Sequence, residues 1–120
     1  MAGEIIPAEV HPKGWGREVW VVNNSKYCGK IMHLNAGKQC SIHYHKVKDE
    51  TFHVLSGMLE LHLFKGGYPE EQSVVVMKQG DTVHIPTGLV HRFRGIEDSM
   101  ILEISTQHFE EDSYRHLKGD

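Results

Sequence analysis

The sequence predicts an all-β protein that folds as one domain, a small barrel or sandwich of short strands. Apolar and polar residues alternate in three segments, 59–64, 81–86 and 99–105, which is the period of a half-buried strand. Turn-forming residues separate such segments at short intervals, and no segment carries a long helical stripe. The chain has 120 residues, which suits a single core.

In chain order, an N-terminal arm over residues 1–16 is expected to precede the strands, and a C-terminal arm over 106–120, with a short helix or an extended segment, to follow them. Strands are expected over residues 28–34, 41–45, 51–56, 59–64, 81–86, 91–95 and 99–105. The turns between them are marked by Asn23-Asn24, Ala36-Gly37, Ser56-Gly57, Gly66-Gly67, Gln79-Gly80-Asp81, Thr87-Gly88 and Gly95.

Composition narrows the function class. Thirteen Lys and Arg stand against 16 Asp and Glu, and no basic stripe is present, which argues against a nucleic-acid partner. No stretch has a signal peptide's pattern or the length of a membrane span, so we expect a cytoplasmic protein without a membrane partner. Cys28 and Cys40 have no CxxC partner, which excludes a zinc ribbon; we expect both to be reduced and buried.

Histidine is over-represented, with ten residues spread through the chain, and this suggests metal or proton chemistry. His43 and His45 share one face of a strand, about 7 Å apart between Cα atoms, and can converge on one ion. Glu50 follows a short loop at the start of the next strand, where an adjacent strand could bring its carboxylate into the same space, and Gly57 ends that strand. Alone, an HxH pair more often lies on a solvated surface.

A second segment has a similar layout. Gly80 leads into a strand, Pro86 and Gly88 form a turn, and His91 opens the strand after it. Two hairpins facing each other would set His91 against His43, His45 and Glu50. Such a site of three histidines and one carboxylate, with open positions, suits one divalent ion of Mn, Fe, Ni, Co or Zn.

These two segments resemble the cupin motifs, G-x5-H-x-H-x3–4-E-x6-G and G-x5-P-x-G-x2-H-x3-N. Every defining position is present except the last, where Gly95 stands in place of Asn. The chain is therefore identified as a member of the cupin superfamily. The resemblance implies a single cupin domain over residues 1–120, a jelly-roll β-barrel (double-stranded β-helix) with its metal-site core over about 29–105.

A narrower resemblance covers most of the chain through short matches. The sequence is similar to the cupin domain of type II mannose-6-phosphate isomerases, although His43 stands where that family often has Gln. The fuller ligand set also resembles small cupin isomerases of free sugars such as D-lyxose. The matching residues are Gly14-Trp15-Gly16, Lys30, Ser41 to His45, Glu50, the LEIS segment, and Glu110-Glu111-Asp112 with Arg115.

The resemblance implies an aldose–ketose isomerase of a sugar or sugar phosphate, in which the metal chelates an enediolate and a nearby base moves the proton. Candidates for that base or for substrate contact are Glu103, Lys30 and His84. Glu103 would be costly to bury without a purpose. Lys30 could instead extend from a strand edge to solvent, and His84 could be an ordinary core histidine.

Strand alternation predicts which neighbours share the interior with the ligands. The inward residues are expected to be Ser41, Phe52, Val54 and Phe93, and the outward ones Ile42, Tyr44, His53, Arg92 and Arg94.

Two other functions are also compatible with the sequence. The same ligand set would serve an Fe- or Ni-dependent dioxygenase with an apolar pocket, and a non-catalytic sugar-binding module would use it without turnover. For each, the partner is a small molecule. A homodimer is expected, because small barrels present open sheet edges that pairing covers.

Overall fold

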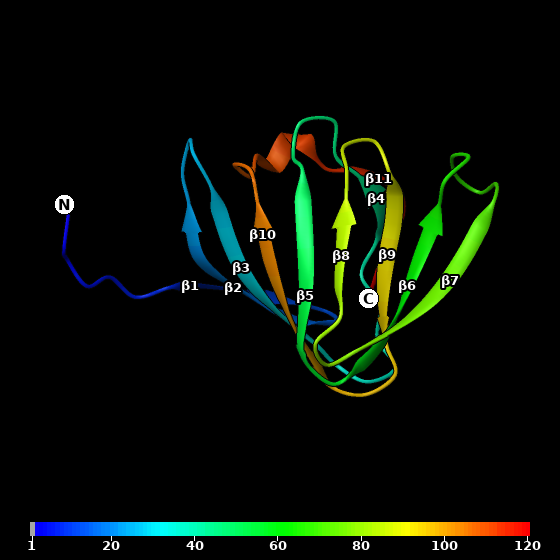
Figure 1. The fold of residues 1–120 in the computed structure, drawn as a ribbon, viewed down its shortest axis with the longest axis horizontal. Helices are drawn as coiled ribbons and strands as arrows, with labels where there is room; N and C mark the ends of the chain where they lie inside the picture. The colour runs from blue at the N-terminus through cyan, green and yellow to red at the C-terminus, as the bar shows by residue number, and fades with distance from the viewer. Residues whose placement is uncertain (1) are drawn as a thin grey trace.

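Two antiparallel β-sheets face each other across the interior in the computed structural model, which describes residues 2–120 (Figure 1). Sheet A has six strands in the order β1-β2-β3-β10-β5-β8, and sheet B has five in the order β11-β4-β9-β6-β7. The strands of sheet A are β1 (Glu9–Lys13), β2 (Gly16–Asn23), β3 (Cys28–Leu34), β10 (Ser99–Ser105), β5 (Glu50–Ser56) and β8 (Thr82–Ile85). Those of sheet B are β11 (Tyr114–Leu117), β4 (Ile42–Tyr44), β9 (Val90–Gly95), β6 (Met58–Phe64) and β7 (Gln72–Lys78). The all-β jelly-roll prediction is confirmed.

The core lies between the sheets because each inner strand turns every second side chain inward. Phe52 and Val54 on β5, Ile101 on β10 and Phe93 on β9 are 2% exposed or less and belong to one apolar cluster. This confirms the predicted orientation of Phe52, Val54 and Phe93. A smaller cluster on the other face of sheet B contains Ile42, Phe64 and Val90, with Tyr44 and Tyr68 packed against it.

Two glycines of the cupin-like segments are required by close backbone packing. Gly57 has φ of +91°, and a Cβ there would collide with the carbonyl oxygen of Asp98. At Gly95 a Cβ would lie 2.6 Å from the carbonyl oxygen of Asn35. Gly95 also exchanges backbone hydrogen bonds with the turn at residues 37–38. The glycine at position 95 therefore suits a close strand–turn contact that leaves no space for an Asn side chain.

The two ends of the chain behave differently. Residues before β1 extend away from the body in Figure 1, and Ile5 and Ile6 are 99% and 75% exposed. The C-terminal segment instead forms a short 3-10 helix, η1 (Glu110–Asp112), and then β11, which pairs with β4. η1 lies at the same end of the molecule as the loop between β4 and β5 (Figure 1). None of the helices in residues 2–120 is long and apolar enough to span a bilayer.

Candidate metal centre

The four expected ligands lie together, but they come from both sheets. His43 on β4 pairs directly with His91 on β9, so their side chains leave the same face of sheet B. His45 follows the end of β4, and Glu50 opens β5 in sheet A. The expectation that Glu50 sits on a strand adjacent to the histidines is therefore wrong. β5 pairs with β10 and β8, and the carboxylate reaches the histidines from the opposite sheet.

The three histidines are fixed in one tautomer by the backbone. The Nδ1 atoms of His43, His45 and His91 lie 2.8, 2.9 and 2.9 Å from the carbonyl oxygens of Ser41, Asp112 and Leu89. A carbonyl oxygen only accepts, so each Nδ1 must carry the proton and donate it. Each Nε2 is left with a free lone pair, which is the form in which a histidine binds a metal.

Burial keeps these rings neutral. Burial lowers the pKa of His43 to about 3, helped by the neighbouring His91, and lowers the pKa of His91 itself to about 4. Burial and then the ammonium of Lys48 lower the pKa of His45 to about 3. No proton therefore competes for the three Nε2 atoms at neutral pH.

The donor atoms are close, although they are more widely spaced than in a finished coordination sphere. Glu50 Oε1 lies 3.7 Å from His45 Nε2, and Glu50 Oε2 lies 3.7 Å from His91 Nε2. Bonds of about 2.1 Å at tetrahedral angles place two ligand atoms roughly 3.4 Å apart. Across residues 2–120, no three His, Cys, Asp or Glu donors are close enough together to form a complete metal-binding group.

Two buried atoms are evidence for a cation bound between the proposed ligands. His91 Nε2 and Glu50 Oε2 are buried and have no hydrogen-bond partner among residues 2–120. Burial raises the pKa of Glu50 to about 7, and the negative charge of Glu103 adds to that effect. The site therefore has a lone pair and a carboxylate oxygen that lack a positive partner. The chemistry of these residues therefore fits a divalent transition metal.

A buried lysine stands between the proposed ligand and the predicted base. Lys48 Nζ lies 3.0 Å from Glu50 Oε1 and 3.2 Å from Glu103 Oε2, and all three side chains are at most 4% exposed. Burial alone would lower the pKa of Lys48, but the carboxylates of Glu103 and Glu50 outweigh it and raise the pKa. Burial would likewise raise the pKa of Glu103, but Lys48 and Lys30 outweigh it and lower the pKa. Glu103 thus stays ionised.

Glu103 and Lys30 both face the interior, as expected. They are direct neighbours across β10 and β3, and they are 3% and 2% exposed. Lys30 Nζ lies 4.1 Å from the centre of the Trp20 ring. It also lies 3.9 Å from Glu18 Oε1, which is too long for a hydrogen bond. Burial lowers the pKa of Lys30, and Glu103 opposes that effect.

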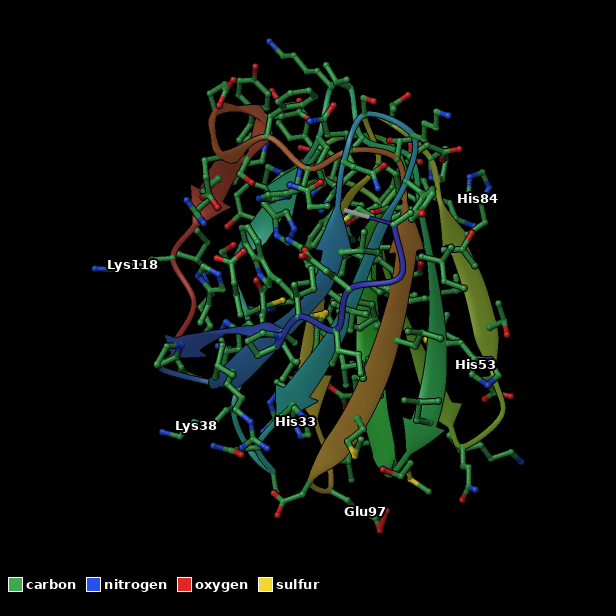
Figure 2. The ribbon with its side chains drawn as sticks, turned by 90° about the vertical axis from the view of Figure 1, so that its left-hand side faces the viewer. His33, Lys38, His53, His84, Glu97 and Lys118 are labelled. Atoms are coloured by element: carbon green, nitrogen blue, oxygen red, sulfur yellow. The ribbon has the colours of Figure 1, made fainter. Side chains whose placement is uncertain are left out.

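The inward placement considered for His84 is wrong. Its side chain is 59% exposed and contacts the carboxylate of Asp49 at 2.6 Å. Figure 2 shows His84 and His53 on the outer surface, pointing away from the barrel. The cause is the alternation of β8, in which the buried Ile85 takes the inner face and Thr82 and His84 take the outer one. We assign His84 no role.

A cavity of about 330 Å³ connects these groups, which is at the small end of the range for ligand pockets. It is lined by the four proposed ligands, by Glu103, Lys30 and Lys48, and by Trp15, Phe52, Phe93 and Arg115, among others. Sequence reasoning missed Lys48 and also His108, whose Nδ1 lies 3.1 Å from Lys48 Nζ. It named Asp112 only as part of an acidic run that matches the family, without a role at the metal centre. Lys48 could have been noticed as a cation that lies between two proposed ligands in the sequence. His108 and Asp112 are distant in the sequence, and only the fold brings them to the site.

Comparison with known proteins supports the fold and the family. The family model of the cupin domain matches residues 30–105. A curated relative, the mannose-1-phosphate guanylyltransferase of Sinorhizobium fredii (strain NBRC 101917 / NGR234), is 24% identical over 99 residues. That match covers 80% of this chain but 18% of the relative, so this chain spans less than a fifth of the relative's length.

Solved structures with the same fold have low sequence identity. A single-substitution variant of oxalate decarboxylase from Bacillus subtilis aligns with a TM-score of 0.78 at 17% identity, over 91% of this chain and 30% of that one. The capsular polysaccharide assembling protein CapF of Staphylococcus aureus aligns with a TM-score of 0.78 at 19% identity, over 90% and 34%. KdgF of Halomonas sp. aligns with a TM-score of 0.67 at 18% identity, over 79% and 81%. With the family model covering more than half of its length, the chain belongs to the cupin family.

Proposed function

We propose that this cupin is a metal-dependent aldose–ketose isomerase of a sugar or sugar phosphate. The observation that carries the proposal is the ionised, buried Glu103, which lines the same cavity as the three histidines and Glu50. A metal held by His43, His45, Glu50 and His91 would polarise the substrate oxygens and stabilise the charge that develops on them. The remaining groups would then have to move a proton between two adjacent carbons.

The chain's own residues suit that proton transfer. Glu103 Oε2 accepts hydrogen bonds from Ser105 Oγ at 2.8 Å and from Lys48 at 3.2 Å, so the carboxylate is held in one orientation. A fixed carboxylate beside a polarised carbonyl can take a proton from one carbon and return it to the next. The ammonium of Lys30, which lies against the Trp20 ring and too far from Glu18 for a hydrogen bond, would be free to donate to a substrate oxygen.

The proposal is tested by proton NMR in D2O. The protein is loaded with Mn, free metal is chelated, and aldoses, ketoses and their 6-phosphates are supplied in turn. Conversion with deuterium entering at C1 or C2 supports an enediol isomerase and identifies the sugar. No conversion over the whole panel contradicts it. Oxygen uptake would then indicate the dioxygenase alternative, and binding without turnover the sugar-binding one.

Replacing Glu103 by glutamine should leave the metal bound but slow isomerisation by about 100-fold or more, because an amide cannot act as the base. Gln keeps an acceptor for Ser105 and the volume of the side chain. The rate and the metal content should be measured together. Glu97→Gln, at a side chain that points into solvent in Figure 2, is the control for one lost negative charge. An unchanged rate in Glu103→Gln would clear that residue of the base role.

Arg115 is a candidate for binding the phosphate group of a sugar phosphate. Arg115 on β11 pairs with His43 on β4 and lines the cavity. Arg94 lies on the outer face of sheet B, where Nη1 is 3.9 Å from Glu60 Oε1. Arginine binds phosphate through two parallel donors, so we propose Arg115 as the phosphate contact if the substrate is phosphorylated.

Arg115→Gln should then raise KM for the sugar phosphate about tenfold or more and leave KM for the unphosphorylated sugar unchanged, since the lost bidentate contact is made to phosphate alone. Arg94→Gln removes the same charge and should change neither value. Steady-state kinetics on both substrates provide the test. Equal changes in KM for the two variants would contradict a role of Arg115 in phosphate binding.

The homodimer also stays a proposal. It is supported by β7, the last strand of sheet B, where Val74, Val75 and Val76 are 51%, 46% and 55% exposed. An apolar edge strand of this kind favours pairing with a second copy.

A further inference from the structure

One residue of the C-terminal segment, Asp112, contacts most of the loop between β4 and β5. This loop, residues 45–49, begins with His45 and leads into Glu50, so it joins two of the four proposed ligands. Asp112, at the end of η1, lies more than sixty residues further along the chain and is 4% exposed. Every contact described next therefore depends on the tertiary fold.

The side chain of Asp112 accepts hydrogen bonds from three successive backbone amides. Oδ1 lies 2.9 Å from the nitrogen of Lys46 and 3.1 Å from that of Val47. Oδ2 lies 3.2 Å from the nitrogen of Val47 and 2.9 Å from that of Lys48. Three consecutive N–H groups converging on one carboxylate fix the backbone of the loop in a concave shape. Without that acceptor the buried amide of Lys48 would lose its partner.

The backbone of Asp112 acts on a proposed ligand itself. Its carbonyl oxygen accepts the hydrogen bond from His45 Nδ1 at 2.9 Å, which sets the tautomer and the rotation of that ring. Asp112 therefore orients His45 through its carbonyl oxygen. Through its carboxylate it fixes the backbone of the loop that leads to Lys48 and Glu50. The adjacent Glu111 belongs to the same 3-10 turn, but it is exposed.

We propose that Asp112 is a positioning residue that assembles the metal centre from the C-terminal segment, so that docking of this segment and binding of a divalent metal stabilise each other. The inference rests on the metal centre proposed above. Coupling of this kind is reciprocal. A metal bound to His45 and Glu50 must stabilise the contacts between the loop and Asp112. Loss of those contacts must lower the affinity for the metal by the same factor.

The first test compares Asp112→Asn with Glu111→Gln in the full chain. Asn has nearly the shape of Asp, but it is neutral and its amide group cannot accept from all three N–H groups. We expect Asp112→Asn to bind Co(II) about 10- to 100-fold more weakly in competition with a chromophoric chelator, the usual cost of losing a partner behind a metal ligand. Glu111→Gln should bind within about twofold of the wild type, because an exposed side chain contributes little.

Hydrogen–deuterium exchange is the readout that a general loss of stability would not reproduce. Metal should slow exchange at the amides of Lys46, Val47 and Lys48 in the wild type, and this protection should be missing in Asp112→Asn although the variant remains folded by circular dichroism. Wild-type metal affinity in Asp112→Asn, or metal that leaves these amides unprotected in the wild type, overturns the proposal.

The two proposals can fail separately. If the wild type binds none of the divalent metals tested, the metal centre itself fails. The positioning role is then judged on the metal-free proteins. Faster exchange at residues 46–48 in Asp112→Asn than in Glu111→Gln supports the role, and equal exchange in the two variants overturns it.

Discussion

Replacing His91 by alanine should abolish stoichiometric binding of a divalent metal. His91 is 1% exposed, and its Nε2 atom is buried, 3.7 Å from Glu50 Oε2, without a hydrogen-bond partner in the described part of the chain. Its Nδ1 is already bonded to the carbonyl of Leu89, so the ring presents only Nε2 to the site. Losing a partner behind a ligand costs about 10- to 100-fold in affinity, so losing a direct ligand should cost more than roughly 100-fold.

The measurement is metal content after equilibrium dialysis, together with a chelator competition that gives the affinity. His53→Ala is the matched control, because His53 lies on the outer surface in Figure 2 and contacts Thr82 rather than the cavity. It should retain a full equivalent of metal. Retention of wild-type affinity by His91→Ala would disprove the ligand assignment.

Replacing Lys48 by methionine should destabilise the metal-free protein by about 3–5 kcal/mol, the usual cost of removing one partner from a buried ion pair. The variant leaves Glu50 and Glu103, both at most 3% exposed, without the ammonium that lies between them. Because a divalent ion would supply positive charge to Glu50, added metal should recover part of this loss. Metal should therefore stabilise Lys48→Met by more than it stabilises the wild type.

Urea unfolding with chelator, and again with saturating metal, provides both free energies of unfolding. Lys46→Met is the control on the same loop. Lys46 is exposed and rests over the Tyr114 ring at 4.4 Å, so its loss should cost less than about 1 kcal/mol. Equal costs for the two variants would show that the buried ion pairs contribute little. A cost for Lys48→Met that metal leaves unchanged would argue against Glu50 as a ligand.

Periodicity and motif spacing were sufficient for the fold and for the face on which the proposed ligands lie. Alternation predicts the inward Phe52, Val54 and Phe93 because strands between two sheets have one buried face. The same alternation, applied strictly to Val83 and Ile85, would have placed His84 on the surface, where it is found. The position of a histidine in a strand therefore follows from the pattern of the strand and not from the chemistry that its ring could perform.

Other parts of the site follow from no local pattern. Lys48 lies in a loop, where periodicity carries no information, and it contacts Glu103 across fifty-five positions of sequence. Asp112 belongs to an acidic run that looks like a solvated surface, yet its neighbours in space are the amides of residues 46–48. Which sheet supplies Glu50 was also beyond the sequence, since this depends on how the two halves of the barrel pair.

The division of the proposed ligands between the sheets has a mechanical consequence. Glu50 belongs to sheet A, and His43 and His91 belong to sheet B, so one ion bound by all of them would be a cross-link between the two halves of the barrel. Apolar packing can yield gradually, whereas coordinate bonds open only when a ligand dissociates. A bound ion would thus hold the two sheets together, and they could separate only after the metal dissociates.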